Sequence, residues 1–332
     1  MGIQLMECGG RCYTAAPLLI DEHDPPLVIY ATGSRVHLVS LKSGQLIATY
    51  EKHSHTVIQL IHDDKEHSIT SVSEDGYISV WNVDTLEEIK AFQVAFPIFD
   101  LVLIASKINS IGIVMRRSVA MTTELKESSN RIQDEYLLAQ YDISANEISK
   151  PLSSLKYPTH CISQLLIPDE YLVAVNRKEV NFFAIESDFR ILFRTELNDM
   201  NCLAINPHKY ILATGHGSGA ITLWYDIHSW LRSIPISSFN SQTIQWKSKP
   251  IHTIVHWHAL PLYTLCFNPD GNFLYSGGEE GVLVQWQLNN SHKKTFLPRL
   301  GAPIASSCSS KSTNATVICT TDNCIRIIDA AR

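Results

Sequence analysis

The chain has 332 residues, 45% of them hydrophobic, and a formal net charge of −6 at pH 7. A chain of this size can bury a large core, and its acidic balance excludes a broadly basic, nucleic-acid-coating surface. No apolar run approaches the ~20 residues of a membrane span, and residues 1–10 lack the basic start and apolar run of a signal peptide. We therefore expect a cytosolic or nuclear protein with no membrane partner.

In chain order, seven six-residue segments read as strands that lead to a large, mostly apolar residue. They are Ser34–Val39, Gly76–Trp81, Tyr136–Tyr141, Lys178–Phe183, Gly219–Trp224, Gly281–Trp286 and Asn323–Ile328. Alternation with a period of two predicts half-buried strands, and a leading glycine supplies a turn. The final residues of successive segments are 42, 60, 42, 41, 62 and 42 positions apart. Spacing of ~40–45 residues is typical of WD repeats, with four strands in each blade of a propeller.

The spacing predicts an all-β fold, a seven-bladed WD-repeat β-propeller that occupies residues 1–332 as a single domain. The two long intervals each hold a polar insert, near residues 118–134 in the third blade and near 229–249 in the fifth. We expect both inserts to be mobile and dispensable for folding, with Trp230 and Trp246 able to hold the second one on the surface.

The later blades can be divided into strands. The sixth is expected to contain Leu262–Phe267, Asn272–Ser276, Val282–Gln287 and His292–Phe296. The last blade, Ile304–Asp329, lacks an outer strand, and Ile3–Cys8 precedes the first blade's own inner strand at Tyr13–Ile20. We expect Ile3–Cys8 to supply the missing strand and close the ring, because closure removes unpaired strand edges.

Two blades repeat a set of polar residues. The sets are His53, Ser71, Asp75 and Trp81, and His258, Ser276, Glu280 and Trp286, each with spacings of 18, 4 and 6. His, Ser and an acid are also the components of a hydrolase triad, but a triad does not recur blade after blade or need a Trp. We interpret both sets as structural hydrogen-bond networks and expect no catalytic residues. In the fifth blade only Thr214 and Trp224 remain, with Ser218 in place of the acid, which predicts an incomplete network.

Other chemical motifs are weak, and we expect no metal, cofactor or small-molecule substrate. Gly215–Gly219 resembles a phosphate loop but has neither the lysine nor the following helix. Alternation puts His256 and His258 on one strand face with Ile254, so a structural role is favoured over a metal site that would also use His252. Four cysteines are spaced poorly for zinc: Cys8, Cys12, Cys319 and Cys324.

Basic residues gather at two places in the sequence. Lys293, Lys294 and Arg299 follow Trp286. Arg116 and Arg117 precede the first insert. One interpretation is that these are solvated charges at strand ends. The other is that they contact a partner or RNA phosphates locally. The sequence leaves both open.

The sixth blade resembles a particular family. The stretch from His256-Trp-His258, through Ser276–Trp286, to Phe296–Ile304 resembles the first propeller of the WD repeat-containing protein 75 family, called Nan1 or Utp17 in yeast. Ala213–His216 and Cys8–Gly10 fit the same resemblance. Members of that family continue into a second propeller and a helical tail, and we expect neither within these 332 residues.

The resemblance implies a nucleolar, non-enzymatic subunit of the UTP-A (t-UTP) part of the small-subunit processome. Such a subunit supports pre-rRNA transcription and early processing of the 18S rRNA precursor, with other processome proteins, and pre-rRNA directly or indirectly, as partners. The alternative is a generic WD-repeat adaptor, such as a ubiquitin-ligase substrate receptor or a trafficking scaffold. Only the resemblance accounts for the Phe296–Ile304 segment.

Overall fold

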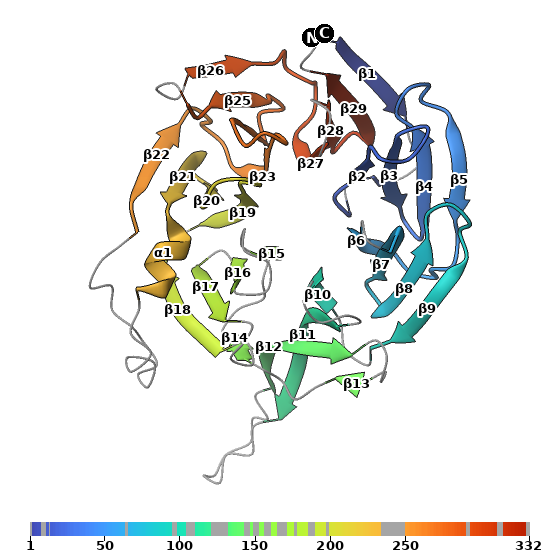
Figure 1. The fold of residues 1–332 in the computed structure, drawn as a ribbon, viewed down its shortest axis with the longest axis horizontal. Coiled ribbons are helices and arrows are strands. Elements are labelled where there is room, and N and C mark those ends of the chain that lie inside the picture. Colours follow the sequence, from blue (N-terminus) through green and yellow to red (C-terminus); the bar gives the residue numbers. More distant parts are fainter. Residues whose placement is uncertain are drawn as a thin grey trace.

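The strands of this computed structural model form seven antiparallel sheets arranged in a ring (Figure 1). The structure describes residues 2–7, 11–12, 14–63, 66–94, 98–103, 110–120, 132–142, 147–148, 153–155, 161–164, 171–175, 178–184, 190–196, 199–233, 250–289, 293–310 and 315–329. Each sheet is one blade, and successive blades follow the chain around the ring.

The strands run outward from the centre of the ring in chain order within each blade. The first blade contains β2 (Leu18–Ile20), β3 (Leu27–Thr32), β4 (Arg35–Ser40) and β5 (Leu46–Tyr50). The second contains β6 (Val57–Asp63), β7 (Ser68–Ser73), β8 (Tyr77–Asn82) and β9 (Glu88–Gln93). The third contains β10 (Ile98–Leu103), β11 (Ser110–Ala120) and β12 (Ile132–Asp142), with β13 (Glu147–Ile148) and β14 (Ser153–Leu155) both pairing with β12.

The remaining blades follow the same plan. The fourth contains β15 (Cys161–Gln164), β16 (Tyr171–Val175), β17 (Glu179–Ala184) and β18 (Arg190–Glu196). The fifth contains β19 (Met200–Ile205), β20 (Ile211–His216), β21 (Ala220–Tyr225) and β22 (His252–His256), with helix α1 (Ile227–Arg232) between its last two strands. The sixth contains β23 (Leu262–Phe267), β24 (Phe273–Gly278), β25 (Val284–Gln287) and β26 (Lys293–Phe296), and the seventh contains β27 (Ile304–Ser309), β28 (Ala315–Thr320), β29 (Cys324–Asp329) and β1 (Gly2–Glu7).

All seven segments found in the sequence end in the third strand of a blade, which confirms the repeat, although in the sixth blade this strand begins only at Val284. The strand is preceded by a tight turn, where Gly76, Gly219 and Gly281 have φ values of 85°, 82° and 66°. Glycine adopts this left-handed conformation without steric cost. At Gly219 a Cβ atom would also overlap the carbonyl oxygen of His258, so this turn needs glycine for space as well.

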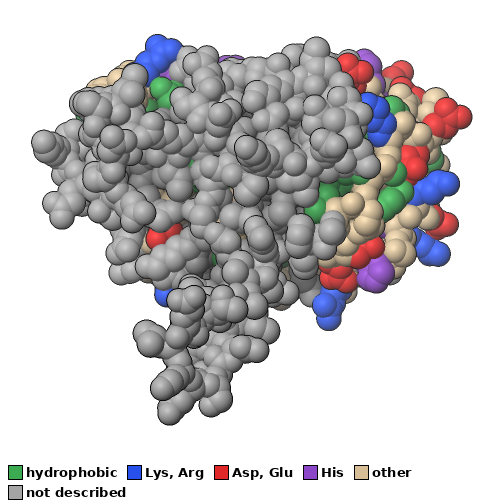
Figure 2. All heavy atoms as spheres, turned by 90° about the horizontal axis from the view of Figure 1, so that it is seen from below, with side chains coloured by type: hydrophobic (Ala, Val, Ile, Leu, Met, Phe, Trp, Pro, Cys, Tyr) green, Lys and Arg blue, Asp and Glu red, His purple; other side chains and the backbone are tan. Residues whose placement is uncertain are grey.

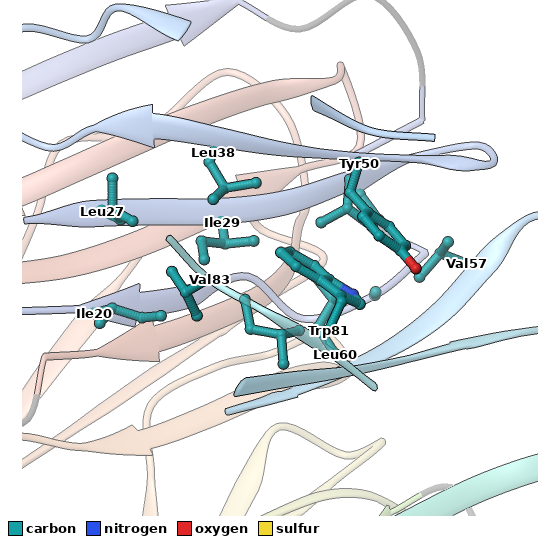
Figure 3. Packing of buried hydrophobic residues seen from close by; sticks show 13 residues of the cluster. Ile20, Leu27, Ile29, Leu38, Tyr50, Val57, Leu60, Trp81 and Val83 are labelled. Atoms are coloured by element: carbon teal, nitrogen blue, oxygen red, sulfur yellow. The ribbon is translucent and has the colours of Figure 1, made fainter. Parts of the chain in front are cut away.

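The core lies between neighbouring blades. Figure 3 shows the cluster between the first and second blades, where Trp81 is fully buried against Ile29, Leu38 and Val57. The Tyr50 ring stacks on Trp81 with centroids 4.4 Å apart. Trp286 occupies the corresponding place between the fifth and sixth blades. In the second and sixth blades the repeated large residue therefore joins the blade to the one before it.

The N-terminal strand completes the last blade. β1 pairs with β29 in an antiparallel register that runs from Gly2 opposite Asp329 to Glu7 opposite Cys324. This confirms the expected partner, with a strand of Gly2–Glu7 instead of Ile3–Cys8, and Cys8 lies outside the described residues. The first blade's inner strand is shorter than expected, beginning at Leu18.

The expected inserts both need correction at their boundaries. Strands β11 and β12 remain paired from Ser118 opposite Asp134 to Ala120 opposite Ile132, so the β-hairpin extends into the first insert. Continued ladder pairing satisfies backbone groups that a loop would leave to solvent. Residues 121–131 lie outside the described part.

The second insert begins with structure. Helix α1 buries Ile227 and Leu231, which explains why this polar-looking stretch folds onto the blade. Trp230 makes an edge-on contact with Phe182 of the fourth blade, with ring centroids 6.0 Å apart. Residues 234–249, including Trp246, are outside the described ranges. Within the described residues, no helix has the length and apolar character needed to cross a bilayer.

Candidate functional site: blade networks and basic residues

The sixth blade holds a buried chain of four polar side chains. Trp286 Nε1 donates to Ser276 Oγ at 2.8 Å, and Ser276 Oγ lies 2.9 Å from His258 Nε2. His258 Nδ1 lies 2.6 Å from Glu280 Oε2. The network joins β24 and β25 to the loop that enters the blade, and Ser276 and His258 are almost completely buried.

Burial lowers the pKa of His258 below its ordinary value, although Glu280 opposes the shift. Burial by itself would raise the pKa of Glu280, but hydrogen bonds from His258 and from the backbone amides of Ala259 and Leu260 lower it. The neutral imidazole therefore donates a hydrogen bond from Nδ1 to the carboxylate and accepts a hydrogen bond from the Ser276 hydroxyl at Nε2. The side chains of this network are therefore bonded to one another, and the buried Ser276 hydroxyl cannot contact a substrate.

The second blade uses one more residue for the same purpose. Trp81 Nε1 donates to Ser71 Oγ at 3.0 Å, and Ser71 Oγ lies 2.6 Å from His53 Nε2. His53 Nδ1 does not reach Asp75; it lies 3.1 Å from Ser73 Oγ, which donates to Asp75 Oδ1 at 2.5 Å. Burial lowers the pKa of His53 to about 4, so this histidine is also neutral at pH 7.

The two blades compensate for the length of the acid. Position 278 of the sixth blade corresponds to position 73 of the second. The sixth blade combines Gly278 with the longer Glu280, whereas the second combines Ser73 with the shorter Asp75. Aspartate has one methylene fewer, and the Ser73 hydroxyl fills the gap. Hydrogen bonds from Ser73 and the Tyr77 amide keep the pKa of Asp75 low, against the effect of burial.

The fifth and seventh blades retain parts of the network. Trp224 Nε1 donates to Thr214 Oγ1 at 3.0 Å in the fifth. In the seventh, Thr320 Oγ1 donates to Asp322, and Arg326 reaches the same carboxylate at 3.2 Å. Thr320, Asp322 and Arg326 were not identified from the sequence as network residues. Asp322 and Thr320 precede Ile328 by the same intervals that separate Asp75 and Ser73 from Trp81, so the spacing could have identified them.

The candidate basic residues do not form one surface. Lys293 and Lys294 are exposed on β26, and Lys294 Nζ lies 5.8 Å from the centroid of the Trp286 ring. Neighbouring residues of a strand point to opposite faces, so these two lysines diverge. Arg299 is exposed beyond the strand. Arg116 and Arg117 lie on β11 in the third blade, on the far side of the ring from β26 (Figure 1).

The charges elsewhere are mixed. On the coloured part of the surface in Figure 2, acidic and basic side chains are interspersed, and neither sign gathers into a broad patch. This agrees with the acidic net charge of the chain. Contact with nucleic acid through these described side chains would therefore have to be local.

The candidate metal ligands have separate partners. The His252 ring lies tilted against Trp224, His256 Nε2 lies 3.2 Å from the carbonyl oxygen of Ser218, and His258 belongs to the sixth-blade network. In the part of the chain that the structure describes, no three His, Cys, Asp or Glu side chains are grouped as metal ligands.

A ring of seven sheets, with a Trp–Ser–His–acid network repeated in its blades, defines the chain as a WD-repeat β-propeller. A model of the first β-propeller of WD repeat-containing protein 75 matches residues 20–323. The chain therefore belongs to the family of WD repeat-containing protein 75 first propellers, as the sixth-blade resemblance predicted.

Individual relatives agree with this family. WD repeat-containing protein 75 of Danio rerio is 27% identical over 341 residues, an alignment that covers 99% of this chain and 38% of the relative. U3 small nucleolar RNA-associated protein 17 of Schizosaccharomyces pombe is 46% identical over 77 residues, covering 23% of this chain and 9% of that protein. The chain thus spans little more than a third of the length of the Danio rerio relative.

The fold also matches solved propellers. The β-propeller domain of Cps50 (Swd1) from Myceliophteria thermophila superposes with a TM-score of 0.74, covering 98% of this chain and 97% of that one. Only 11% of the residues are identical, so this likeness supports the fold alone.

Proposed function

We propose that this propeller is a non-catalytic scaffold of the small-subunit processome. In this role it supports pre-rRNA transcription and early processing of the 18S rRNA precursor in the nucleolus, with other UTP-A proteins as partners. The observation that carries the proposal is the family match over residues 20–323, together with the U3 small nucleolar RNA-associated relative in fission yeast. The bonding within the blade networks supports a scaffold, because it leaves no free nucleophile and base there.

Depletion of the full-length protein in cells tests this function. We expect unprocessed 18S precursor to accumulate on a northern blot and newly made 18S rRNA to fall, while 5S rRNA made by a separate polymerase is unchanged. Re-expression of the full-length protein should restore processing. Normal 18S maturation after depletion would contradict the proposal.

The alternative is a WD-repeat adaptor in another assembly. The β-propeller fold is compatible with this alternative, because one fold serves proteins of many functions. The Phe296–Ile304 segment distinguishes the two candidates. Exchanging it for the corresponding segment of an unrelated propeller should abolish processome assembly but spare a generic adaptor function.

Local RNA contact at β26 is a further part of the proposal. Phe296 is 45% exposed and lies on the same face of β26 as Lys294 by strand alternation, and Trp257 lies against its ring with centroids 4.7 Å apart. An exposed aromatic beside a cation suits a stacked base with its phosphate. Lys293 and Arg299 would add charge from the other face and from the following loop.

The salt dependence of RNA binding tests this contact. Each neutralised phosphate contributes ~0.7 to the slope of log affinity against log salt for single strands, so three contacts predict a slope of about −2. Alanine at Lys293, Lys294 and Arg299 should abolish binding of a pre-rRNA leader segment to this chain. The matched control replaces three exposed cations elsewhere, Arg35, Lys42 and Lys52. Equal losses in both variants, or no salt-dependent binding at all, would limit the propeller to protein contacts.

A further inference from the structure

A cavity opens on one face of the ring, between the first and second blades. This face, termed the top face, carries the turns between the second and third strands of each blade and the loops between blades. The cavity has a volume of about 450 Å³, and its lining includes Arg11, Thr14, Thr32, Thr56 and Glu74. The volume lies within the ~300–1,000 Å³ usual for ligand sites.

The cavity walls are fixed by backbone bonds. The Val57 amide donates to the Gly33 carbonyl at 2.8 Å, which ties the turn of the first blade to the start of β6. The Glu74 amide donates to the Thr56 carbonyl at 2.9 Å, which ties the turn of the second blade to the same point. The two turns therefore hold the lining residues in place before any partner binds.

Two opposite charges at this cavity are unpaired. Arg11 and Glu74 are both exposed, and among the described residues neither side chain forms an ion pair or hydrogen bond. They also do not pair with each other. Elsewhere in the same region, exposed opposite charges do meet, as Arg35 and Glu51 do at 3.1 Å. A cation and an anion kept apart across one cavity can each receive a complementary charge.

A buried hydroxyl at the cavity also lacks a partner. Thr14 Oγ1 is shielded from solvent, and the structure gives it no hydrogen bond. Thr32 Oγ1, in contrast, lies 2.7 Å from His37 Nε2. Because protein encloses Thr14 Oγ1, a ligand in the cavity cannot reach it without movement of the wall, so this hydroxyl adds no preformed contact.

We propose that this cavity binds an extended polypeptide segment of a partner that carries one acidic and one basic side chain. The acidic side chain pairs with Arg11 and the basic one with Glu74. An extended chain presents side chains and backbone polar groups every ~3.3 Å, which suits donors and charges spread along a seam between blades. Glu74 disfavours a nucleic acid here. The inference depends on the cavity and not on the assembly that the propeller serves.

A peptide array with systematic charge placement tests the proposal on this 332-residue chain. The probes are hexapeptides that combine one Asp, one Lys and four Gly or Ser residues in every order and spacing. We expect preferred binding for one order of charges. Arg11→Glu and Glu74→Arg should each lower binding of the preferred peptides about tenfold, as loss of a charged hydrogen bond does. The double variant should bind peptides of the reversed order.

The control exchanges charges on the opposite face. Lys42→Glu with Glu87→Arg alters two exposed residues in the turns between third and fourth strands, and it should bind like the parent. Arg11→Gln and Glu74→Gln repeat the test without charge reversal, should a reversed variant fold poorly. The proposal is overturned by indifference to charge order, by a double variant that keeps the parent's preference, or by equal loss in the control. Displacement of the peptides by equimolar free lysine and aspartate would overturn the polypeptide assignment in favour of small zwitterions.

Discussion

In the second and sixth blades, a tryptophan N–H donates to a serine, and the serine donates to a neutral histidine. The histidine then donates to Glu280 in the sixth blade and to Ser73, which bonds to Asp75, in the second. Trp286 is buried to 2% exposure and is both a packing element between blades and the donor that begins the chain. The hydroxyl of Ser276 can accept from Trp286 and donate to His258 at once. Packing and polar bonding at one residue are therefore coupled.

Replacing Trp286 separates these two roles. Trp286→Ala should lower the free energy of unfolding by ~3–5 kcal/mol, the range for truncating a buried aromatic. Trp286→Phe keeps an aromatic ring but loses the N–H donor and part of the ring volume, so we expect a smaller cost of about 1–3 kcal/mol. Urea denaturation measures both. An Ala variant as stable as the Phe variant would show that this position is not a core anchor.

The low pKa of His53 predicts a pH dependence of stability. Burial lowers the pKa of His53 to about 4 in the folded chain, whereas an unfolded histidine has a pKa near 6.5. The unfolded state therefore binds more protons between these values, and stability falls as pH decreases from 6.5 to 4. The contribution of His53 over the whole window is roughly 3 kcal/mol.

Chemical denaturation at a series of pH values measures this contribution. His53→Gln should be less stable than the parent at pH 7 and lose less stability on acidification, since one titrating group is removed. His208→Gln, at an exposed position, should keep the parent's pH dependence. An unchanged pH profile in His53→Gln would mean that His53 is not held neutral by burial.

The residues of the networks were predictable from spacing, but their contacts were not. His53 reaches Asp75 through Ser73, whereas His258 contacts Glu280 directly, because the contact depends on side-chain length at two positions. The Tyr50 ring on Trp81 comes from a neighbouring blade. A linear repeat cannot show such a contact between blades.

At the scale of elements, the third strand of each blade was predictable and the outer strands were less so. Each third strand follows a turn, alternates apolar with polar residues and ends on a large, mostly apolar residue. These features identified the third strand of all seven blades. Outer strands are exposed on one side, so little burial constrains their sequence. The third blade illustrates this, with its outer edge divided between β13 and β14. The helix α1 was missed because it has only six residues, too few for Ile227 and Leu231 to show a helical period in the sequence.

Deleting residues 1–10 tests the role of β1. The deletion leaves the outer edge of β29 unpaired, since β1 pairs with it along its whole length. An open strand edge invites pairing with other chains. We expect a lower melting temperature and aggregation seen by size-exclusion chromatography. A variant of the same length in which 1–10 are shuffled should behave like the deletion, and a monomeric deletion variant of parental stability would contradict the assigned pairing.

At the scale of the whole molecule, the ring follows from the period, while the surfaces that meet partners do not. The number of blades follows from the regular spacing of the seven third strands along the chain. The cavity that brings Arg11 near Glu74 arises only when the first blade packs against the second. The sequence likewise grouped Arg116 and Arg117 with the β26 lysines as contact candidates, and the ring separates them.

The proposed role in the small-subunit processome rests on the family assignment, and the association of the full-length protein with U3 small nucleolar RNA tests that proposal most directly. The tagged protein would be precipitated from nuclear extract and the bound RNA quantified by reverse transcription and PCR. We expect enrichment of U3 over another box C/D RNA that guides methylation, with loss of the enrichment when the Phe296–Ile304 segment is exchanged. Recovery of U3 no higher than that of the guide RNA, from a protein that is soluble and intact, would contradict the processome assignment.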